Sequence, residues 1–146
     1  MKTPVGIVGF RGYSGQELIR ILSRHPHVEP VLLEHRESEP EPAPIGHPGP
    51  RRAACTADAV KAEGLAAVFL ATPHDVAMEL SPVMLSAGAK VVDLSAAFRL
   101  ETGENYQRWY KEPHTQPELL KEAVYSIPEF HRAKVPTARL ISNPGC

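Results

Sequence analysis

Cysteine, net charge and long apolar runs are all scarce in this 146-residue sequence. The two cysteines have no spacing typical of a disulfide framework, and we assign no metal-ligating residues. No apolar run approaches the ~20 residues needed to cross a bilayer, and the first residues show no signal-peptide pattern. A formal net charge of −1 argues against nucleic-acid and membrane partners. We therefore expect a cytoplasmic protein.

Hydrophobic residues are plentiful, at 42% of a chain that is near the usual size of one domain. Apolar runs alternate with helical patterns, which favours an α/β fold with a parallel sheet. Strands are predicted at residues 5–8, 28–33, 67–71, 90–94, 124–126 and 138–142. Helices are predicted at residues 15–24, 57–63, 75–87, 106–110 and 117–122. We expect a Rossmann-type doubly wound, mostly parallel sheet.

Prolines interrupt this alternation at three places. Pro30 favours the start of the second strand or an edge of the sheet. Five prolines between Pro40 and Pro50 predict a loop over residues 37–52. Pro82 is expected to end one helical piece and begin another, and Gly88 to close the second piece.

Three glycines mark the turn between the first strand and the first helix. Gly9 and Gly12 would let a pyrophosphate approach the backbone, and Gly15 would let the helix pack closely on the strand. Ser14 is predicted as the N-cap of this helix, with Glu17 completing a capping box. The free amide groups of the helix N-terminus would then face an anion. The pattern predicts a dinucleotide site.

The end of the second strand normally meets the adenosine ribose, and here the sequence supports two cofactors. Glu34 lies where an acid holds the 2′-hydroxyl of NAD. Arg36, with His35, would instead hold the 2′-phosphate of NADP. The two interpretations conflict, and both stay open at this point.

Ligands of doubly wound sheets bind at the carboxyl ends of the strands. The turns after Gly9, Glu34, Ala71 and Leu94 should therefore meet at one crevice. The residues with polar groups to offer there are Ser14, Arg36, Thr72, His74, Ser95 and Arg99.

The last residues, Asn143 to Cys146, follow a predicted strand and should also lie beside the crevice. A cysteine directly after such a turn suits a helix N-terminus, where the thiolate is favoured. A carboxylate on Cys146 itself would oppose thiolate formation. The cysteine is therefore either structural or the last residue of a fragment, and we favour the fragment.

Taken together, the motifs resemble those of the N-acetyl-gamma-glutamyl-phosphate reductase family, the arginine-pathway relatives of aspartate-semialdehyde dehydrogenase. The resemblance rests on residues 9–18, 73–74, 93–100, 125–129 and 143–146, in this order. The sequence departs from the family pattern at three points. Ala97 stands where Asp is usual, Ser126 where Gly is usual, and Glu34-His35 where small polar residues are common.

The resemblance implies that residues 1–146 are an NAD(P)-binding domain ending on the nucleophile. A catalytic and dimerisation domain would follow residue 146, which makes a homo-oligomer the expected state. Cys146 would attack the acyl phosphate of N-acetylglutamyl 5-phosphate to form a thioester, and NADPH would reduce that thioester to the semialdehyde. Asn143 would position the thiolate or stabilise the oxyanion, and Arg99 would bind the leaving phosphate.

The residues assigned to the NADP(H) site come from the glycine motif and from the turns predicted to form the crevice. They are Gly9, Gly12, Tyr13, Ser14, Gly15, Arg36, Thr72, His74 and Ser95. Two alternatives remain: a sister reductase acting on aminoadipyl or aspartyl phosphate, and a non-catalytic module that senses NADP.

Overall fold

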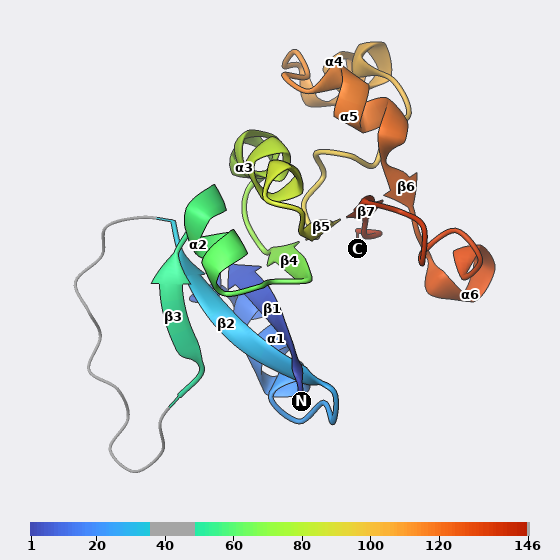
Figure 1. The fold of residues 1–146 in the computed structure, drawn as a ribbon. Coiled ribbons are helices and arrows are strands. Elements are labelled where there is room, and N and C mark those ends of the chain that lie inside the picture. Colours follow the sequence, from blue (N-terminus) through green and yellow to red (C-terminus); the bar gives the residue numbers. More distant parts are fainter. Residues whose placement is uncertain (36–48, 146) are drawn as a thin grey trace.

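The computed structural model describes residues 1–35 and 49–145, and Figure 1 shows their fold. The strands are β1 (Thr3–Val8), β2 (Val28–Glu34), β3 (Arg51–Ala54), β4 (Ala67–Leu70), β5 (Lys90–Asp93), β6 (Val124–Tyr125) and β7 (Leu140–Ser142). The helices are α1 (Tyr13–Leu22), α2 (Ala57–Ala62), α3 (His74–Ser86), α4 (Gly103–Tyr110), α5 (Pro117–Glu122) and α6 (Pro128–His131).

Within the described residues, the strands form one seven-stranded sheet in the order β3-β2-β1-β4-β5-β7-β6. Every recorded pair of neighbouring strands is parallel. From β1 the chain continues to β2 on one side of β1, whereas β4 and β5 lie on the other side of β1. Because these crossovers are right-handed, the connecting helices must lie on opposite faces. This confirms the predicted doubly wound fold.

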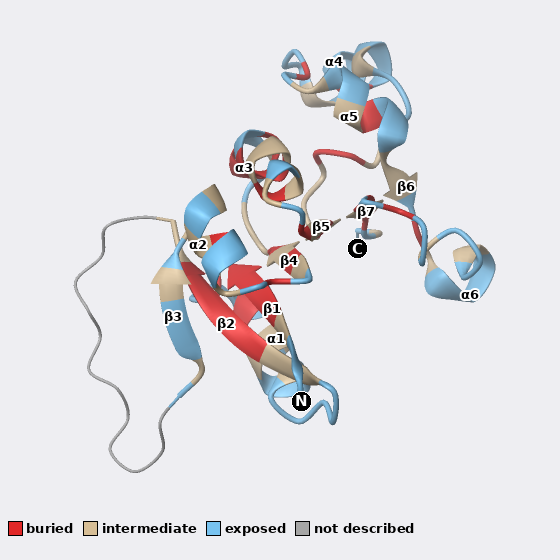
Figure 2. Ribbon diagram, viewed as in Figure 1, coloured by how far each residue is buried: buried red, intermediate tan, exposed pale blue. Residues whose placement is uncertain are grey.

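The two faces of the sheet have separate cores, and Figure 2 shows the buried central strands between them. On the α1 face, Ile7, Phe10 and Leu32 pack against apolar side chains of α1. On the other face, α2 and α3 cover a larger cluster that includes Val8 and Val68, both completely buried. Strands buried on both faces read as continuous apolar runs, which is why they were predictable.

A strand that the sequence did not predict pairs with β2 at the edge of the sheet. The loop prediction over 37–52 is wrong at its end, because Arg51 and Arg52 begin β3. Their side chains are exposed and charged, so the segment lacks the apolar pattern of a strand. Pairing with β2 decides its structure, with Arg51 beside Val31. Pro30 lies just before this paired stretch, so its missing N–H costs no bond to β3.

Two predicted helix boundaries are corrected by the structure. The N-cap of α1 is Gly12 and no side chain caps it, so the Ser14–Glu17 capping box is wrong. Glu17 instead accepts a hydrogen bond of 2.8 Å from Arg20 Nε. The second correction is that α3 continues through Pro82 as one helix. Gly88 follows α3 with φ +91°, in agreement with its predicted role in closing the helix.

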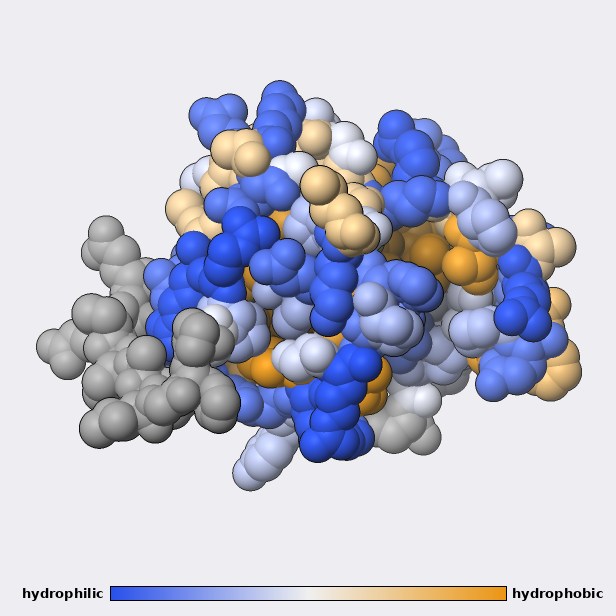
Figure 3. All heavy atoms as spheres, turned by 60° about the horizontal axis from the view of Figure 1, so that its bottom comes forward, coloured by the Kyte–Doolittle hydropathy of each residue, from blue (hydrophilic) through white to orange (hydrophobic). Residues whose placement is uncertain are grey.

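The face of the molecule in Figure 3 is mostly hydrophilic. The most hydrophobic residues show mainly between polar ones, and moderately hydrophobic residues are scattered over the surface. Across residues 1–35 and 49–145, no helix has the length and apolar character required to cross a membrane.

Gly15→Ala tests how closely α1 packs on the turn before it. A Cβ at Gly15 would collide with the carbonyl oxygen of Gly9 and the Cα of Phe10, and both are backbone atoms. We expect a loss of about 2 kcal/mol or more in the free energy of unfolding, because the clash outweighs the roughly 1 kcal/mol of helix propensity gained. Urea denaturation measures it.

Gly103→Ala is the matched control, because it is also a glycine in the first turn of a helix. Its added Cβ would meet nothing closer than His114 Cβ at 3.8 Å. This variant should be at least as stable as the unmodified chain. Equal effects at the two positions would contradict the packing explanation.

Candidate functional site

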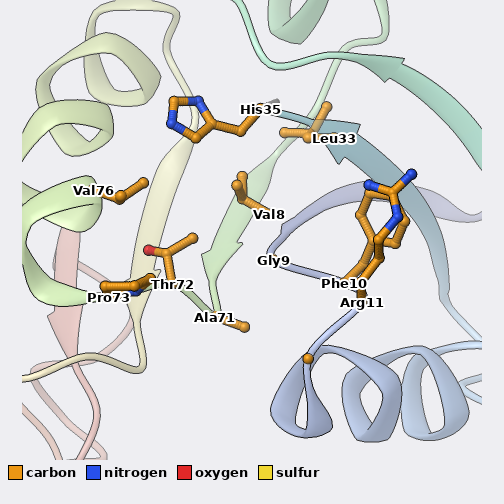
Figure 4. A pocket seen from close by; sticks show the side chains of 11 residues that line it. Val8, Gly9, Phe10, Arg11, Leu33, His35, Ala71, Thr72, Pro73 and Val76 are labelled. Carbon is orange, nitrogen blue, oxygen red and sulfur yellow. The ribbon is translucent and has the colours of Figure 1, made fainter. Parts of the chain in front are cut away.

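A cavity of about 300 Å³ opens at the carboxyl ends of β1, β2 and β4 (Figure 4). It lies at the point where the chain turns to opposite sides of the sheet, which is where doubly wound folds bind ligands. Three of the four turns predicted to meet at a crevice do line it. The lining residues are Val8, Gly9, Phe10, Arg11, Gly12, Leu33, His35, Ala71, Thr72, Pro73 and Val76.

Glycine occupies the three positions of the first turn for different physical reasons. Gly9 has φ +76°, and a Cβ on it would collide with the carbonyl oxygen of Ala71. Gly15 is buried against the backbone of the same turn, as predicted. Gly12 has φ −76° and ψ 169°, and its added Cβ would meet only Gly9 O, at 3.5 Å. The protein itself therefore leaves room for a side chain at Gly12, next to the cavity.

The N-terminus of α1 borders the cavity through Gly12. Because Gly12 supplies no capping side chain, the first N–H groups of α1 have no side-chain acceptor of the usual N-cap kind. Tyr13 and Ser14 begin the helix with exposed side chains. An uncapped N-terminus with its positive dipole end beside a cavity is suited to binding an anion.

Thr72 and His74 follow β4 but lie in different surroundings. Thr72 lines the cavity, and its buried Oγ1 has no hydrogen-bond partner among the residues that the structure describes. Such an orphaned group is costly unless something else binds it. His74 is not among the lining residues. Its Nε2 lies 3.5 Å from Glu112 Oε2, and its ring lies 5.9 Å from that of Tyr110.

At the end of β2, the Glu34 carboxylate meets two arginines. Arg52 Nη1 donates to Glu34 Oε1 at 3.2 Å, and Arg11 Nη2 lies 3.7 Å from the same oxygen. Both guanidinium groups also lie over the ring of Phe10. The predicted site residue Arg36 lies outside the described residues. The sequence analysis did not identify Arg11 or Arg52 as site residues. Arg11 could have been identified from its position inside the glycine turn, whereas nothing in the sequence indicated Arg52.

The remaining predicted residues gather at the ends of β5 and β7, away from the lining of the cavity. Asn143 N donates to Asp93 O at 2.8 Å, which holds the segment after β7 against the end of β5. Ser95 Oγ accepts from Ala97 N at 3.1 Å, so it stabilises its own loop. Arg99 Nε donates to Asn143 O at 2.9 Å, and Arg99 Nη2 donates to Leu94 O at 2.8 Å.

Arg99 therefore joins the loop after β5 to the segment after β7. Its guanidinium also lies beside Gly145, where an added Cβ would meet it. These bonds hold the backbone leading to Cys146 at Asn143. Cys146 itself lies outside the described residues. The other cysteine, Cys55, is a partly buried free thiol whose pKa burial raises to about 11.

An aromatic layer supports this loop from α4. His114 Nε2 donates to Ala97 O at 2.8 Å, and its Nδ1 accepts from Gln116 N at 3.0 Å. These two bonds require the neutral ring, and burial lowers the pKa of His114 accordingly. Tyr106 stacks on Tyr110 at 4.7 Å and meets His114 edge-on at 4.8 Å. The sequence contained no signal for the contact between His114 and Ala97.

Asp93 is the buried acid beneath this loop. Its Oδ1 accepts from Ser95 N at 2.9 Å, whereas Oδ2 is buried with no partner in the described part of the chain. Burial raises the pKa of Asp93, although the hydrogen bonds from Ser95 and the charge of Arg99 act in the opposite direction. The folded protein therefore holds this proton more tightly than the unfolded chain does.

Asp93→Asn should raise the free energy of unfolding at pH 7. A carboxyl whose pKa is raised by folding destabilises the protein as pH rises above the ordinary pKa of Asp, because the unfolded chain then releases a proton that the folded state retains. Above the raised pKa, the folded state must instead hold a poorly solvated charge. The gain should disappear when the pH falls below that ordinary pKa, where Asp93 is protonated in both states. Urea denaturation between pH 3 and pH 7 measures it, and a difference that does not change with pH would contradict it.

Comparison with known proteins agrees with this geometry. A family described as the NAD-binding domain of semialdehyde dehydrogenase matches residues 4–138. N-acetyl-gamma-glutamyl-phosphate reductases of Herminiimonas arsenicoxydans and Ectopseudomonas mendocina are each 45% identical over 97% of the chain. The chain covers 42% and 43% of those two proteins, less than half of their length.

Solved structures share the fold at low sequence identity. Aspartate semialdehyde dehydrogenase II of Vibrio cholerae, complexed with ASA, has a TM-score of 0.69 at 17% identity over 100% of this chain and 42% of its own. The Candida albicans enzyme with NADP has a TM-score of 0.61 at 18% identity over 98% of this chain and 42% of its own. By its sheet, its glycine turn and its match over residues 4–138, the chain belongs to the semialdehyde dehydrogenase NAD-binding domain family.

Proposed function

We propose that this chain is the NADPH-binding part of a reductase that converts N-acetylglutamyl 5-phosphate to N-acetylglutamate 5-semialdehyde and phosphate, in arginine biosynthesis. The observation that carries the proposal is the 45% identity to N-acetyl-gamma-glutamyl-phosphate reductases, in a chain whose glycine turn opens a cavity at the switch point of the sheet. The same resemblance supports a cytoplasmic homo-oligomer as the working form of the enzyme.

The residues around the cavity fit a dinucleotide. The uncapped N-terminus of α1 presents N–H groups for a pyrophosphate. Gly12 adjoins open space that a side chain would fill, so the backbone can approach a ligand there. Thr72 offers a buried hydroxyl that lacks a partner within residues 1–35 and 49–145. The Gly12 turn and the Thr72 hydroxyl follow different strands, and both offer hydrogen-bond donors toward the same cavity.

Cys146 is the proposed nucleophile. Its thiolate would attack the acyl carbon, the bond from that carbon to the phosphate oxygen would break, and phosphate would leave as a thioester forms. NADPH would supply the hydride to the thioester carbon, and cleavage of the carbon–sulfur bond would then release the aldehyde and restore the Cys146 thiolate. Asn143 is proposed to orient the thiolate, and Arg99 holds the backbone of the segment that leads to it. A cation at that place also suits a departing phosphate.

Gly12→Thr tests the cofactor proposal in this 146-residue chain. Threonine caps helices about as well as glycine, so we expect the unfolding midpoint to change little. Its branched side chain would fill the space beside the cavity, and its hydroxyl would compete for the N–H groups of α1. NADPH affinity, measured by nicotinamide fluorescence, should fall at least tenfold. Unchanged affinity would contradict the assignment of this turn to the pyrophosphate.

Cys146→Ser tests the reaction in a complete reductase that has this chain as its cofactor-binding part. Turnover of N-acetylglutamyl 5-phosphate should be lost while NADPH binding is unchanged, since a hydroxyl is a poor nucleophile without a dedicated base. Cys55→Ser is the matched control and should retain turnover, because the Cys55 thiol is partly buried with a pKa of about 11.

Two outcomes would contradict this assignment. Activity retained in Cys146→Ser would overturn the nucleophile. Faster turnover of aminoadipyl phosphate or aspartyl phosphate by the unmodified enzyme would overturn the substrate and favour a sister reductase.

A further inference from the structure

Two arginines meet at the end of β2: Arg11 lines the cavity, and Arg52 lies next to it without being a lining residue. Arg11 comes from the turn after β1, and Arg52 comes from β3, 41 positions later in the sequence. Their guanidinium groups converge on one carboxylate oxygen, Glu34 Oε1, at 3.7 Å and 3.2 Å. Among these three described side chains, two cations share one anion, so the group carries a formal charge of +1.

The ring of Phe10 holds the two guanidinium groups in place. The Arg11 Cζ lies 4.7 Å from the ring centroid, and the Arg52 Cζ lies 5.6 Å from it. Figure 4 shows the Arg11 side chain against the Phe10 ring on one side of the cavity, with Thr72 and Val76 on the other. Because Phe10 is only 5% exposed and packs in the α1-face core, it is a rigid platform. Both arginines lose less freedom on binding an anion when they are already held.

We propose that Arg11 and Arg52 bind the 2′-phosphate of NADPH and that Glu34 is their counter-ion when this phosphate is absent. This inference rests on the proposed function, because it requires the adenosine ribose to lie at the end of β2. A phosphate dianion matches two guanidinium groups in charge and in hydrogen-bonding geometry. The same acid that would hold a 2′-hydroxyl of NAD is here engaged by both arginines.

The alternative is that the arginines only form surface ion pairs. All three side chains are partly exposed: 39% for Arg11, 35% for Arg52 and 37% for Glu34. Exposed ion pairs contribute about 0–1 kcal/mol to stability, so stability alone gives little reason for two of them on one oxygen. The location beside the cavity, the shared ring and the excess positive charge all favour an anion as the missing partner.

The test compares cofactors that differ only in the 2′-phosphate. NADPH and NADH are titrated by nicotinamide fluorescence, and 2′-phosphorylated ADP and plain ADP by calorimetry, on the unmodified chain and on each variant. Arg11→Ala and Arg52→Ala should each weaken NADPH about tenfold while changing NADH less than twofold, because one charge-assisted hydrogen bond is lost. The 2′-phosphorylated ADP should follow NADPH, and plain ADP should follow NADH.

Two further variants sharpen the test. Arg51→Ala is the matched control: Arg51 is the neighbour of Arg52 in β3 and pairs with Glu29 and Glu63 instead. It should leave both cofactors unchanged, since Arg51 lies beside Val31 of the opposite core. Glu34→Gln should raise the affinity for NADPH several-fold and change the affinity for NADH less than twofold, because a carboxylate that competes with the 2′-phosphate is removed.

The outcomes separate this inference from the proposed function. If the unmodified chain binds NADPH but Arg11→Ala and Arg52→Ala weaken NADPH and NADH equally, or neither, the arginine pair is not the phosphate site. If Glu34→Gln weakens NADH and leaves the affinity for NADPH unchanged, Glu34 is a ribose ligand and the inference is wrong. If the unmodified chain binds neither cofactor, both proposals are wrong.

Discussion

The close approach of three backbone segments at the switch point is the constraint on which the rest of the structure depends. The turn after β1 meets the carbonyl of Ala71 at the end of β4, and α1 rests on the same turn. Gly9 and Gly15 allow these contacts because a side chain at either position would collide with backbone atoms. Backbone atoms cannot move aside as side chains do, so this geometry depends on glycine. It leaves the N-terminus of α1 beside an open cavity.

The proposed function uses two places in the structure, the cavity and the segment after β7. The sheet order places β5 and then β7 next to β4, so the carboxyl ends of these strands lie in a row along the same end of the sheet. Leu94 N donates to Leu70 O, and Asn143 N donates to Asp93 O, which continues the backbone contacts outward from the cavity. Arg99 then holds the two outer segments together through Leu94 and Asn143. The proposed reaction needs this alignment, because the cofactor and the nucleophile come from different strands.

Charge is distributed unevenly along the carboxyl ends of the strands. Arg11 and Arg52 accompany one carboxylate at the end of β2, whereas Asp93 is buried beneath the loop after β5. The first arrangement favours a bound anion, and the second costs stability that the hydrogen bond from Ser95 N offsets only in part. A buried acid at a strand end is a cost that a stability optimum would avoid. Such costs are common at functional sites.

The sequence alone determined most of the fold, because its signals are local. Apolar runs, the glycine turn and Gly88 depend on neighbouring residues, and they predicted β1, β2, β4, β5 and a doubly wound sheet. The tertiary structure decided β3, which has a polar sequence and exists through its pairing with β2. It also decided which predicted residues line the cavity: Gly9, Gly12 and Thr72 do, whereas Ser95 and Arg99 stabilise the neighbouring loop. Arg11 and Arg52 meet over the ring of Phe10 and both pair with Glu34. These contacts join residues far apart in the chain, and no local pattern encodes them.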